Sequence, residues 1–434
     1  MSSKDVLLYF GTEEAKVTAG QDADCQVKLK KEDCQIYNIS DPEELKTACE
    51  SEGNTYIFMD AASSVSTNQA TDANNNQLTN ITSGTKIIRG NGGKVQQSTN
   101  DNKTLTTEGG QIKLFNVSGN STILEINNLT FTAASGKTVG ATSTLDGALI
   151  YVDDGATVIL KQCLIENMSV SYRDTSLIYV KSGGKLLVEN CTFYNNKSTG
   201  SGNVGYSECI RIDNGAQVEV VSCNFESNGD EDLMANAAAI ENSGSCHITN
   251  TTFKGNTANR GSAIMNNDTG ILEIESSTFD SNTCTSNGGY YARRGGAIFS
   301  QGGTVRIKDS TFTGNKSRGN NPGSEGTTNG EFQKLGGGAI SIKTGSLVLQ
   351  NTKFENNSVT LTSSNDAYGY GGAILIEQSD ASLFLKDANG SAIDIESYIS
   401  NYMSGNTTEK SNAGANIYCN GGTINGTVYT QAWE

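Results

Sequence analysis

Two neighbouring acids, Asp153 and Asp154, are the side chains of this sequence most readily connected with catalysis. A pair of carboxylates can hydrolyse a glycosidic bond when one acts as the acid and the other as the base or nucleophile. Neighbours on a strand point to opposite sides, however, and the following Gly155 is typical of a turn. We therefore expect Asp153 and Asp154 to form a turn rather than a catalytic site.

The other reactive side chains do not make a recognisable catalytic or metal-binding set. His247 is the single histidine, and it follows Cys246 on a segment with no nucleophile pattern, where we expect it to face outwards. The ten cysteines include no Cys-x-x-Cys pair, so zinc is not indicated. The sequence also has no nonapeptide calcium repeat. It predicts no cofactor, no metal and no enzymatic activity.

Recognition is the chemistry that the sequence does indicate. Aromatic and cationic side chains stand in segments of variable length, which cover eight positions from Asn256 to Ile264 and twenty-five from Asn315 to Ile340. Exposed aromatic and arginine side chains are common anchors of binding surfaces. The alternative is that these segments only shield the flank of the protein. The candidate binding residues are Tyr290, Tyr291, Arg293, Arg294, Phe332, Lys334, Tyr368 and Tyr370.

A repeated pattern must position these segments. A clear copy has paired hydrophobes (Val305 and Ile307), then a small residue (Ser310), an aromatic residue (Phe312) and Asn315. Six copies are complete, two earlier ones lack the Asn, and successive copies lie 26 to 42 residues apart. Fixed offsets inside each copy and variable spacing between copies are typical of stacked repeats.

A second mark, Ala-Ile after Gly-Gly, precedes most copies, as at 295–298, 337–340 and 371–374. Each repeat therefore predicts a strand, a short turn, a second strand, a turn and a loop of free length. Residues 304–308 alternate with period two, which is typical of a half-buried strand. We expect no helix-period stretch after residue 60. The predicted fold is all-β, a single right-handed parallel β-helix with a short N-terminal capping helix.

Gly-Gly-Ala-Ile paired with Phe-x-x-Asn resembles the repeat of the polymorphic outer-membrane proteins, a family of surface proteins that includes adhesins. The resemblance is strongest over residues 235–375 and implies a surface-protein role. Arg306-Ile307-Lys308 also superficially resembles the Arg-Ile-Lys of polygalacturonases, but their Gly-His-Gly is absent. Since Arg306 and Lys308 alternate with core hydrophobes, we expect both to lie on an outer face.

Composition narrows the possible partners. The 434 residues carry a net charge of −16, only 18% are charged, and 49 are glycine. Such an acidic chain is repelled by phosphate backbones and anionic lipid headgroups, so we expect no nucleic-acid partner and no direct membrane insertion. Self-association, another surface protein or a glycan are the expected partners.

The chain divides into four predicted parts, in which a rung is one turn of the coil. They are an N-terminal cap with a short helix (1–55), early irregular rungs with polar loops (56–110), regular rungs (111–375), and terminal rungs with a C-terminal cap (376–434). Asp41 and Pro42 predict the start of the capping helix, and residues 56–59 the first buried strand. Residues 85–90 predict an early rung.

Three buried columns follow from the repeat. The phenylalanines should stack along the molecule, and the asparagines should bond to each other from rung to rung, with Asn also accepting a left-handed turn. Cys163, Cys191 and Cys223 share one position and predict a ladder of free thiols, while Cys246 should be buried and inert. The alternative for the ladder is one disulfide between adjacent rungs. Among Cys25, Cys34 and Cys49, one bridge could pin the cap.

Sixteen Asn-x-Ser/Thr sequons are present, and sugars at some of them would be typical of a secreted protein, although Asn-rich repeats also create sequons by themselves. Asn196 and Asn315 occupy the buried Asn position and should be bare. The first ten residues lack the longer apolar core of a signal peptide, and we favour a leader that has been removed.

The sequence predicts a non-enzymatic extracellular or cell-surface protein, an adhesin or a structural unit of a coat or filament, with recognition by stacked loops at one corner. The alternative is a carbohydrate-active depolymerase, a polysaccharide lyase or glycoside hydrolase, with carboxylates from different loops.

Overall fold

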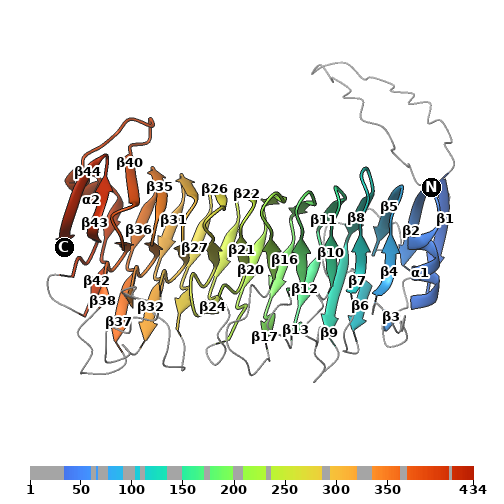
Figure 1. The fold of residues 1–434 in the computed structure, drawn as a ribbon. Coiled ribbons are helices and arrows are strands. Elements are labelled where there is room, and N and C mark those ends of the chain that lie inside the picture. Colours follow the sequence, from blue (N-terminus) through green and yellow to red (C-terminus); the bar gives the residue numbers. More distant parts are fainter. Residues whose placement is uncertain are drawn as a thin grey trace, which may run out of the picture.

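In the computed structural model the chain forms one elongated coil of stacked strands (Figure 1). The structure describes residues 34–59, 65–66, 77–90, 103–107, 113–133, 149–170, 176–198, 209–230, 236–285, 294–319, 335–361, 369–409 and 413–434. Each turn of the coil, or rung, places its strands on their equivalents in the neighbouring rungs, in parallel and in register. The predicted all-β parallel β-helix is confirmed.

Three rows of strands run along the coil. The first row holds strands most of which begin with Ile: β4 (Gln77–Ile81), β7 (Lys113–Val117), β10 (Ile150–Val152), β14 (Ile178–Val180), β18 (Ile210–Ile212), β21 (Ile240–Asn242), β25 (Ile264–Asn266), β29 (Ile298–Ser300), β34 (Ile340–Ile342), β39 (Ile374–Ile376) and β43 (Ile417–Ile424). The second row holds the paired hydrophobes: β1 (Cys34–Ile39), β2 (Asn54–Met59), β5 (Thr85–Arg89), β8 (Ile123–Asn127), β11 (Thr157–Lys161), β15 (Lys185–Glu189), β19 (Gln217–Val221), β22 (Ser245–Thr249), β26 (Ile271–Glu275), β30 (Thr304–Lys308), β35 (Gly345–Gln350) and β40 (Ala381–Lys386).

The third row holds the phenylalanine strands: β3 (Val65–Ser66), β6 (Lys103–Thr107), β9 (Leu129–Ala133), β12 (Leu164–Glu166), β16 (Thr192–Tyr194), β20 (Asn224–Glu226), β23 (Thr252–Lys254), β27 (Thr278–Asp280), β31 (Thr311–Thr313), β36 (Lys353–Glu355) and β41 (Met403–Ser404). Short strands beside the loops complete the rungs: β13 (Ser169–Val170), β17 (Lys197–Ser198), β24 (Thr257–Ala258), β28 (Thr283–Cys284), β32 (Lys316–Gly319), β33 (Leu335–Gly336), β37 (Ser358–Leu361), β38 (Gly369–Tyr370) and β42 (Thr407–Thr408).

Left-handed residues make the corners of each rung. In the rung of Phe279, Ser276 (φ 51°) separates β26 from β27 and Ser281 (φ 56°) ends β27. The first of these residues turns the chain between the paired hydrophobes and the phenylalanine, which therefore lie on separate strands of the rung. The prediction that the repeat Asn itself takes the left-handed turn is wrong. The residue before it does so, which leaves Asn282 free to direct its amide inwards.

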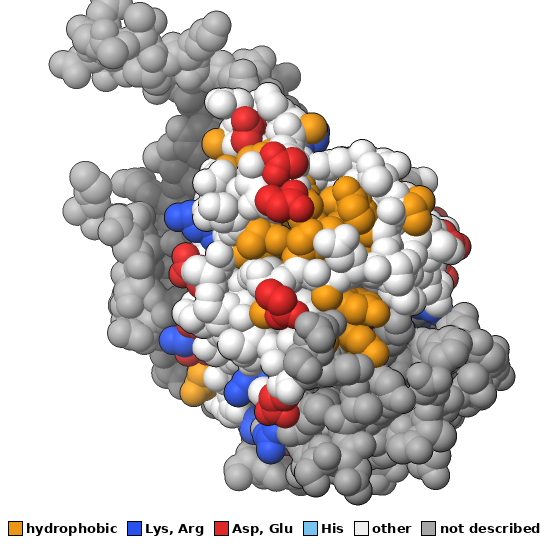
Figure 2. Space-filling model, turned by 90° about the vertical axis from the view of Figure 1, so that its left-hand side faces the viewer, with side chains coloured by type: hydrophobic (Ala, Val, Ile, Leu, Met, Phe, Trp, Pro, Cys, Tyr) orange, Lys and Arg blue, Asp and Glu red, His pale blue; other side chains and the backbone are white. Residues whose placement is uncertain are grey.

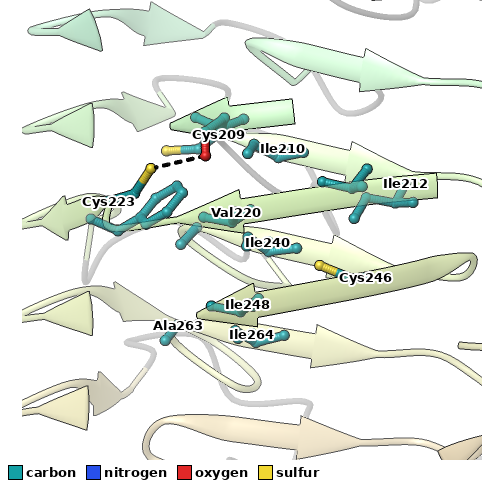
Figure 3. Close-up of a cluster of buried hydrophobic side chains, with 14 of the residues drawn as sticks. Cys209, Ile210, Ile212, Val220, Cys223, Ile240, Cys246, Ile248, Ala263 and Ile264 are labelled. Atoms are coloured by element: carbon teal, nitrogen blue, oxygen red, sulfur yellow. Dashed lines mark hydrogen bonds between the residues drawn. The ribbon is translucent and has the colours of Figure 1, made fainter. Parts of the chain in front are cut away.

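A stack of phenylalanine rings fills the interior. The rings of Phe193, Phe225, Phe253, Phe279, Phe312 and Phe354 lie 4.5 to 5.0 Å apart and within 10° of parallel. Each of these side chains is fully buried, and burial of one such side chain stabilises the fold by about 1.5–3 kcal/mol. Figure 3 shows how the aliphatic and thiol side chains of the first and second rows also point into the interior. The predicted phenylalanine column is confirmed.

Asparagines form a second buried column beside the rings. Asn282 accepts from the backbone N–H and the amide of Asn256, at 3.1 and 2.9 Å, and its own amide donates to Asn315 at 2.9 Å. The same bonds link Asn196, Asn228, Asn256, Asn282, Asn315, Asn357 and Asn406. The ladder thus supplies partners to buried backbone groups that the strands leave unpaired. The burial of the sequons at Asn196 and Asn315 is confirmed, and that they stay bare remains a prediction.

The cysteine column is also confirmed. Cys163, Cys191 and Cys223 are buried free thiols in one file. The backbone N–H of Cys163 donates to the sulfur of Cys191 at 3.3 Å, and that of Cys191 to the sulfur of Cys223 at 3.5 Å. A disulfide that pins the cap is not supported, because Cys34 and Cys49 are both free, while Cys25 lies outside the described residues.

Cys246 makes the stability of the protein sensitive to alkaline pH. Burial raises the pKa of its thiol from 9.0 to about 12. A raised pKa means that the stabilisation is complete below pH 9 and is lost as the pH rises towards 12. We expect the free energy of unfolding to fall by about 2 kcal/mol between pH 8 and about pH 10.5 because of this thiol alone.

Urea unfolding of the wild type and of Cys246→Val at both pH values would measure this effect. Valine fits the column, where Val218 and Leu272 flank Cys246. The other buried thiols lose stability in both proteins, so the difference isolates Cys246. An equal alkaline loss in the two proteins would contradict the prediction.

The turn that precedes each Gly-Gly-Ala-Ile strand requires glycine. Gly337 has a φ of 63°, and a Cβ there would clash with the carbonyl oxygen of Ile340. The next residue, Gly338, lies against the carbonyl oxygen of Gly372 in the neighbouring rung. Two successive glycines therefore allow both the turn and the close approach of adjacent rungs.

The N-terminal end is closed by α1 (Pro42–Glu50), as predicted. Asp41 caps this helix by accepting from the N–H of Glu44 at 2.9 Å. Leu45, Ala48 and Cys49 point into the core. The helix takes the place that a first-row strand would occupy next to β4. The prediction that residues 56–59 form the first buried strand is confirmed by β2. An additional, largely exposed strand, β1, precedes the helix and pairs with β2.

The C-terminal end contains two features that differ from the prediction. A second helix, α2 (Ile395–Tyr402), begins at Asp394, which accepts from the N–H of Ser397 at 2.8 Å. Its apolar residues follow helical spacing, so the expectation of no helix-period stretch after residue 60 is wrong. The chain then ends in β43 and β44 (Thr427–Trp433), which pair in antiparallel fashion through a turn at Asn425-Gly426.

Candidate functional site: the loop-bearing corner

The predicted binding residues fall into two groups. Arg294 and Tyr370 belong to the described residues, whereas Tyr290, Tyr291, Arg293, Phe332, Lys334 and Tyr368 lie outside them. Tyr370 is half-buried, and its ring centre lies 4.4 Å from that of Tyr418. The exposed position expected for Arg294 is wrong, because the side chain is only 6% exposed.

The strands that flank the variable segments stack on each other. β32 pairs with β37 before the segments 320–334 and 362–368, and β33 pairs with β38 after them. One rung earlier, β28 pairs with β32. The segments therefore begin at neighbouring strand ends and return to neighbouring strands. This arrangement is what the predicted side-by-side loops require.

The segments return next to an outward-facing line of residues, here called the outer row. Each member follows the Ile that begins a first-row strand, and adjacent members are register partners. The outer row is Tyr151, Tyr179, Arg211, Glu241, Met265, Phe299, Ser341, Leu375 and Tyr418. Most of these residues are buried although they face away from the core. Met265 and Phe299, for example, form a small separate hydrophobic cluster with Ala237.

Sequence reasoning missed the outer row. The sequence did contain a signal for it. A strand with one face in solvent carries polar residues at its outward positions, whereas Met265, Phe299 and Leu375 are large apolar residues at such positions.

Arg294 joins the base of a variable segment to the outer row. Its Nη2 lies 3.2 Å from Oε2 of Glu377, which follows β39 two rungs further on. Its guanidinium carbon lies 5.4 Å from the ring centre of Phe299. The hydroxyl of Ser341 donates to Oε1 of Glu377 at 2.6 Å. The opposite charges of this buried pair attract each other, although Nη2 and Oε2 do not meet at hydrogen-bonding angles. These contacts join Arg294, the last residue before Gly295, to side chains of three rungs.

A second cluster lies at the other end of the outer row. The Tyr179 hydroxyl donates to Asp213 at 2.7 Å, and Lys181 lies 3.3 Å from the same carboxylate. Arg211 stands 4.6 Å from the centre of the Tyr179 ring, within the range of cation–π attraction. Tyr151 packs edge-on against that ring at 5.6 Å. The outer row is therefore polar and aromatic towards the N-terminal end and mainly apolar towards the C-terminal end.

The residues considered as catalytic candidates lie in a turn or on the outer face of the coil. Asp154 is left-handed (φ 49°), and its N–H donates to the carboxylate of Asp153 at 2.9 Å, so the predicted turn is confirmed. Arg306 and Lys308 lie on the outer face, as predicted, and pair with Glu273 and Glu275 of the neighbouring rung. His247 is exposed and faces away from the core.

Among the described residues, no three or more His, Cys, Asp or Glu side chains converge in a way that could hold a metal ion. None of their helices combines the length and the apolar character needed to cross a membrane.

Comparisons with known proteins agree with the fold. Residues 112–312 match a family model described as "Right handed beta helix region". No curated protein and no solved structure matches the chain. The more specific resemblance to polymorphic outer-membrane proteins stays a prediction. The matched region covers first-, second- and third-row strands that all stack in parallel, so this chain is a right-handed parallel β-helix.

Proposed function

We propose that this chain is a non-enzymatic recognition protein of the cell surface or the extracellular space, in which a β-helix presents loops from one corner to a protein or glycan partner. The observation that carries the proposal is the in-register stacking of the strands on both sides of the variable segments. A rigid scaffold with loops of free length is a common arrangement for binding surfaces.

Three further observations support the proposal. The buried Arg294–Glu377 pair anchors one segment at its base, which reduces the freedom that binding would otherwise remove. The aromatic and cationic residues of these segments contrast with a net charge of −16. The sequons and the resemblance to surface proteins favour a location outside the cell.

The experiment compares the full chain with a variant in which residues 320–334 are replaced by a short return like the natural one between Asn256 and Ile264. Both proteins are applied to an array of acidic and neutral glycans and to whole cells. We expect unchanged thermal unfolding and a loss of binding of at least tenfold in the variant. Equal binding by both proteins, or binding by neither, would contradict the proposal.

The same samples test the alternative function, a carbohydrate-active depolymerase. Shortening of the polysaccharides by the full chain, measured by size-exclusion chromatography, would favour it over a recognition protein.

A further inference from the structure

The C-terminal end of the coil carries an edge strand with little of the usual protection, which is limited to one register shift in its pairing with β43, between Asn420 and Thr423. Among the described residues, β44 pairs with β43 alone. Its seven residues, Thr-Val-Tyr-Thr-Gln-Ala-Trp, include no charged residue and no proline. Edge strands of natural proteins usually carry lysine, proline or a bulge that prevents pairing with another chain. β44 therefore has the composition of a strand that can accept a partner.

An apolar surface lies beside this edge. Figure 2 views the molecule from this end and shows hydrophobic side chains gathered across its centre, with acidic side chains around them. Ile393, Ile399, Tyr402 and Tyr429 pack against the core but stay partly exposed. Val428, on β44, is 68% exposed. The end thus offers backbone hydrogen-bonding groups and apolar area together, which are the two components of strand addition.

The pairing strand itself brings no charge to a contact between two copies. Each chain carries a net charge of −16, so two copies repel each other at long range. β44 contributes none of these charges. The carboxylate of the adjacent Glu434 is held back on the same chain by the N–H groups of Gly414 and Ala415, at 3.3 and 3.2 Å. Pairing along β44 therefore buries no charge of this strand, and the acidic side chains of this end stay around the contact.

We propose that two copies of this chain associate through their C-terminal ends, with β44 of each copy paired in antiparallel fashion to β44 of the other. A two-fold axis makes such a pair antiparallel by necessity, needs only one surface, and closes after two copies. The other end of the sheet offers β1, where Ile36 is 57% exposed. Pairing of β44 with β1 of a second copy would instead leave free ends and continue into a filament.

The interface is small, since one edge strand and a few apolar side chains fall short of the roughly 1,200 Å² of a standard stable interface. We therefore expect a reversible dimer with a dissociation constant on the order of micromolar. Salt should strengthen the dimer, because it screens the repulsion between the two acidic bodies.

Sedimentation velocity of the 434-residue chain over a concentration series, at low and high salt, tests the proposal. We expect monomer and dimer only. Val428→Lys and Val428→Asp should each weaken the dimer at least tenfold without changing thermal unfolding, because the side chain is exposed in the monomer and either charge would be desolvated at the pairing edge. Ile271→Lys is the matched control: Ile271 is 47% exposed on β26, far from both ends, and its substitution should leave the dimer unchanged.

Three results would overturn the proposal: a monomer at every concentration and salt level, a dimer that both Val428 variants leave intact, or open-ended polymers that Ile36→Lys abolishes. The loop-replaced variant described above should dimerise as the full chain does. Failure of the recognition proposal is thereby distinguishable from failure of this one.

Discussion

Replacement of Phe279 by alanine is expected to lower the free energy of unfolding by about 3–5 kcal/mol. The ring of Phe279 lies between those of Phe253 and Phe312, at 4.8 and 4.5 Å, and is fully buried. Alanine would remove the burial of the ring and leave a cavity that the neighbouring rungs, fixed by their strand pairing, fill only in part. Denaturant unfolding followed by circular dichroism would measure the loss.

Phe384→Ala is the matched control. Phe384 stands on β40 and is 39% exposed, so its replacement should cost less than about 1 kcal/mol. Hydrogen exchange adds a spatial check, because each rung contacts only its neighbours. Protection should fall around β23, β27 and β31 and stay unchanged around β15. A cost for Phe279→Ala no larger than that for Phe384→Ala would exclude the ring stack as the main packing element.

The second large effect is expected for Glu377→Ala, with a loss of about 3–5 kcal/mol. Alanine would leave the guanidinium of Arg294 buried without its carboxylate, and the hydroxyl of Ser341 without its acceptor. A buried charge without a partner is far more costly than the net gain from the pair itself. The midpoint of urea unfolding would show the loss.

Two further variants identify the cause. Glu273→Ala breaks the exposed pair with Arg306, in which the side chains are 50% and 54% exposed, and should cost less than about 1 kcal/mol. The double variant Arg294→Met, Glu377→Leu should recover most of the stability, because it removes both charges together. If the double variant is as unstable as Glu377→Ala, packing rather than the unpaired charge is responsible.

The elements that each rung repeats could be predicted from the amino-acid sequence. The phenylalanines, the asparagine ladder and the glycine corners recur at fixed offsets, and each contacts its own equivalent in the next rung. Because the neighbour of every repeated residue is another copy of itself, knowledge of one rung predicts the column. The capping helix was predictable for a local reason, since Asp41 and Pro42 mark its start by hydrogen bonding and backbone geometry alone.

The features that no repeat encodes became visible only in the folded chain. Arg294 and Glu377 come from different rungs and occupy different positions of the repeat, so no periodicity connects them, although Arg260 is the register partner of Arg294. The burial of the outer row depends on residues that lie over it, such as Ala237 and Arg294 against Phe299. The period-two pattern of a strand shows which way a side chain points but not what covers it. The antiparallel direction of β44 follows from a hairpin at the last rung. The first two features depend on contacts between residues distant in the sequence, where local propensity carries no information. The hairpin is different, because Asn425-Gly426 is a local signal for it that the sequence analysis did not use.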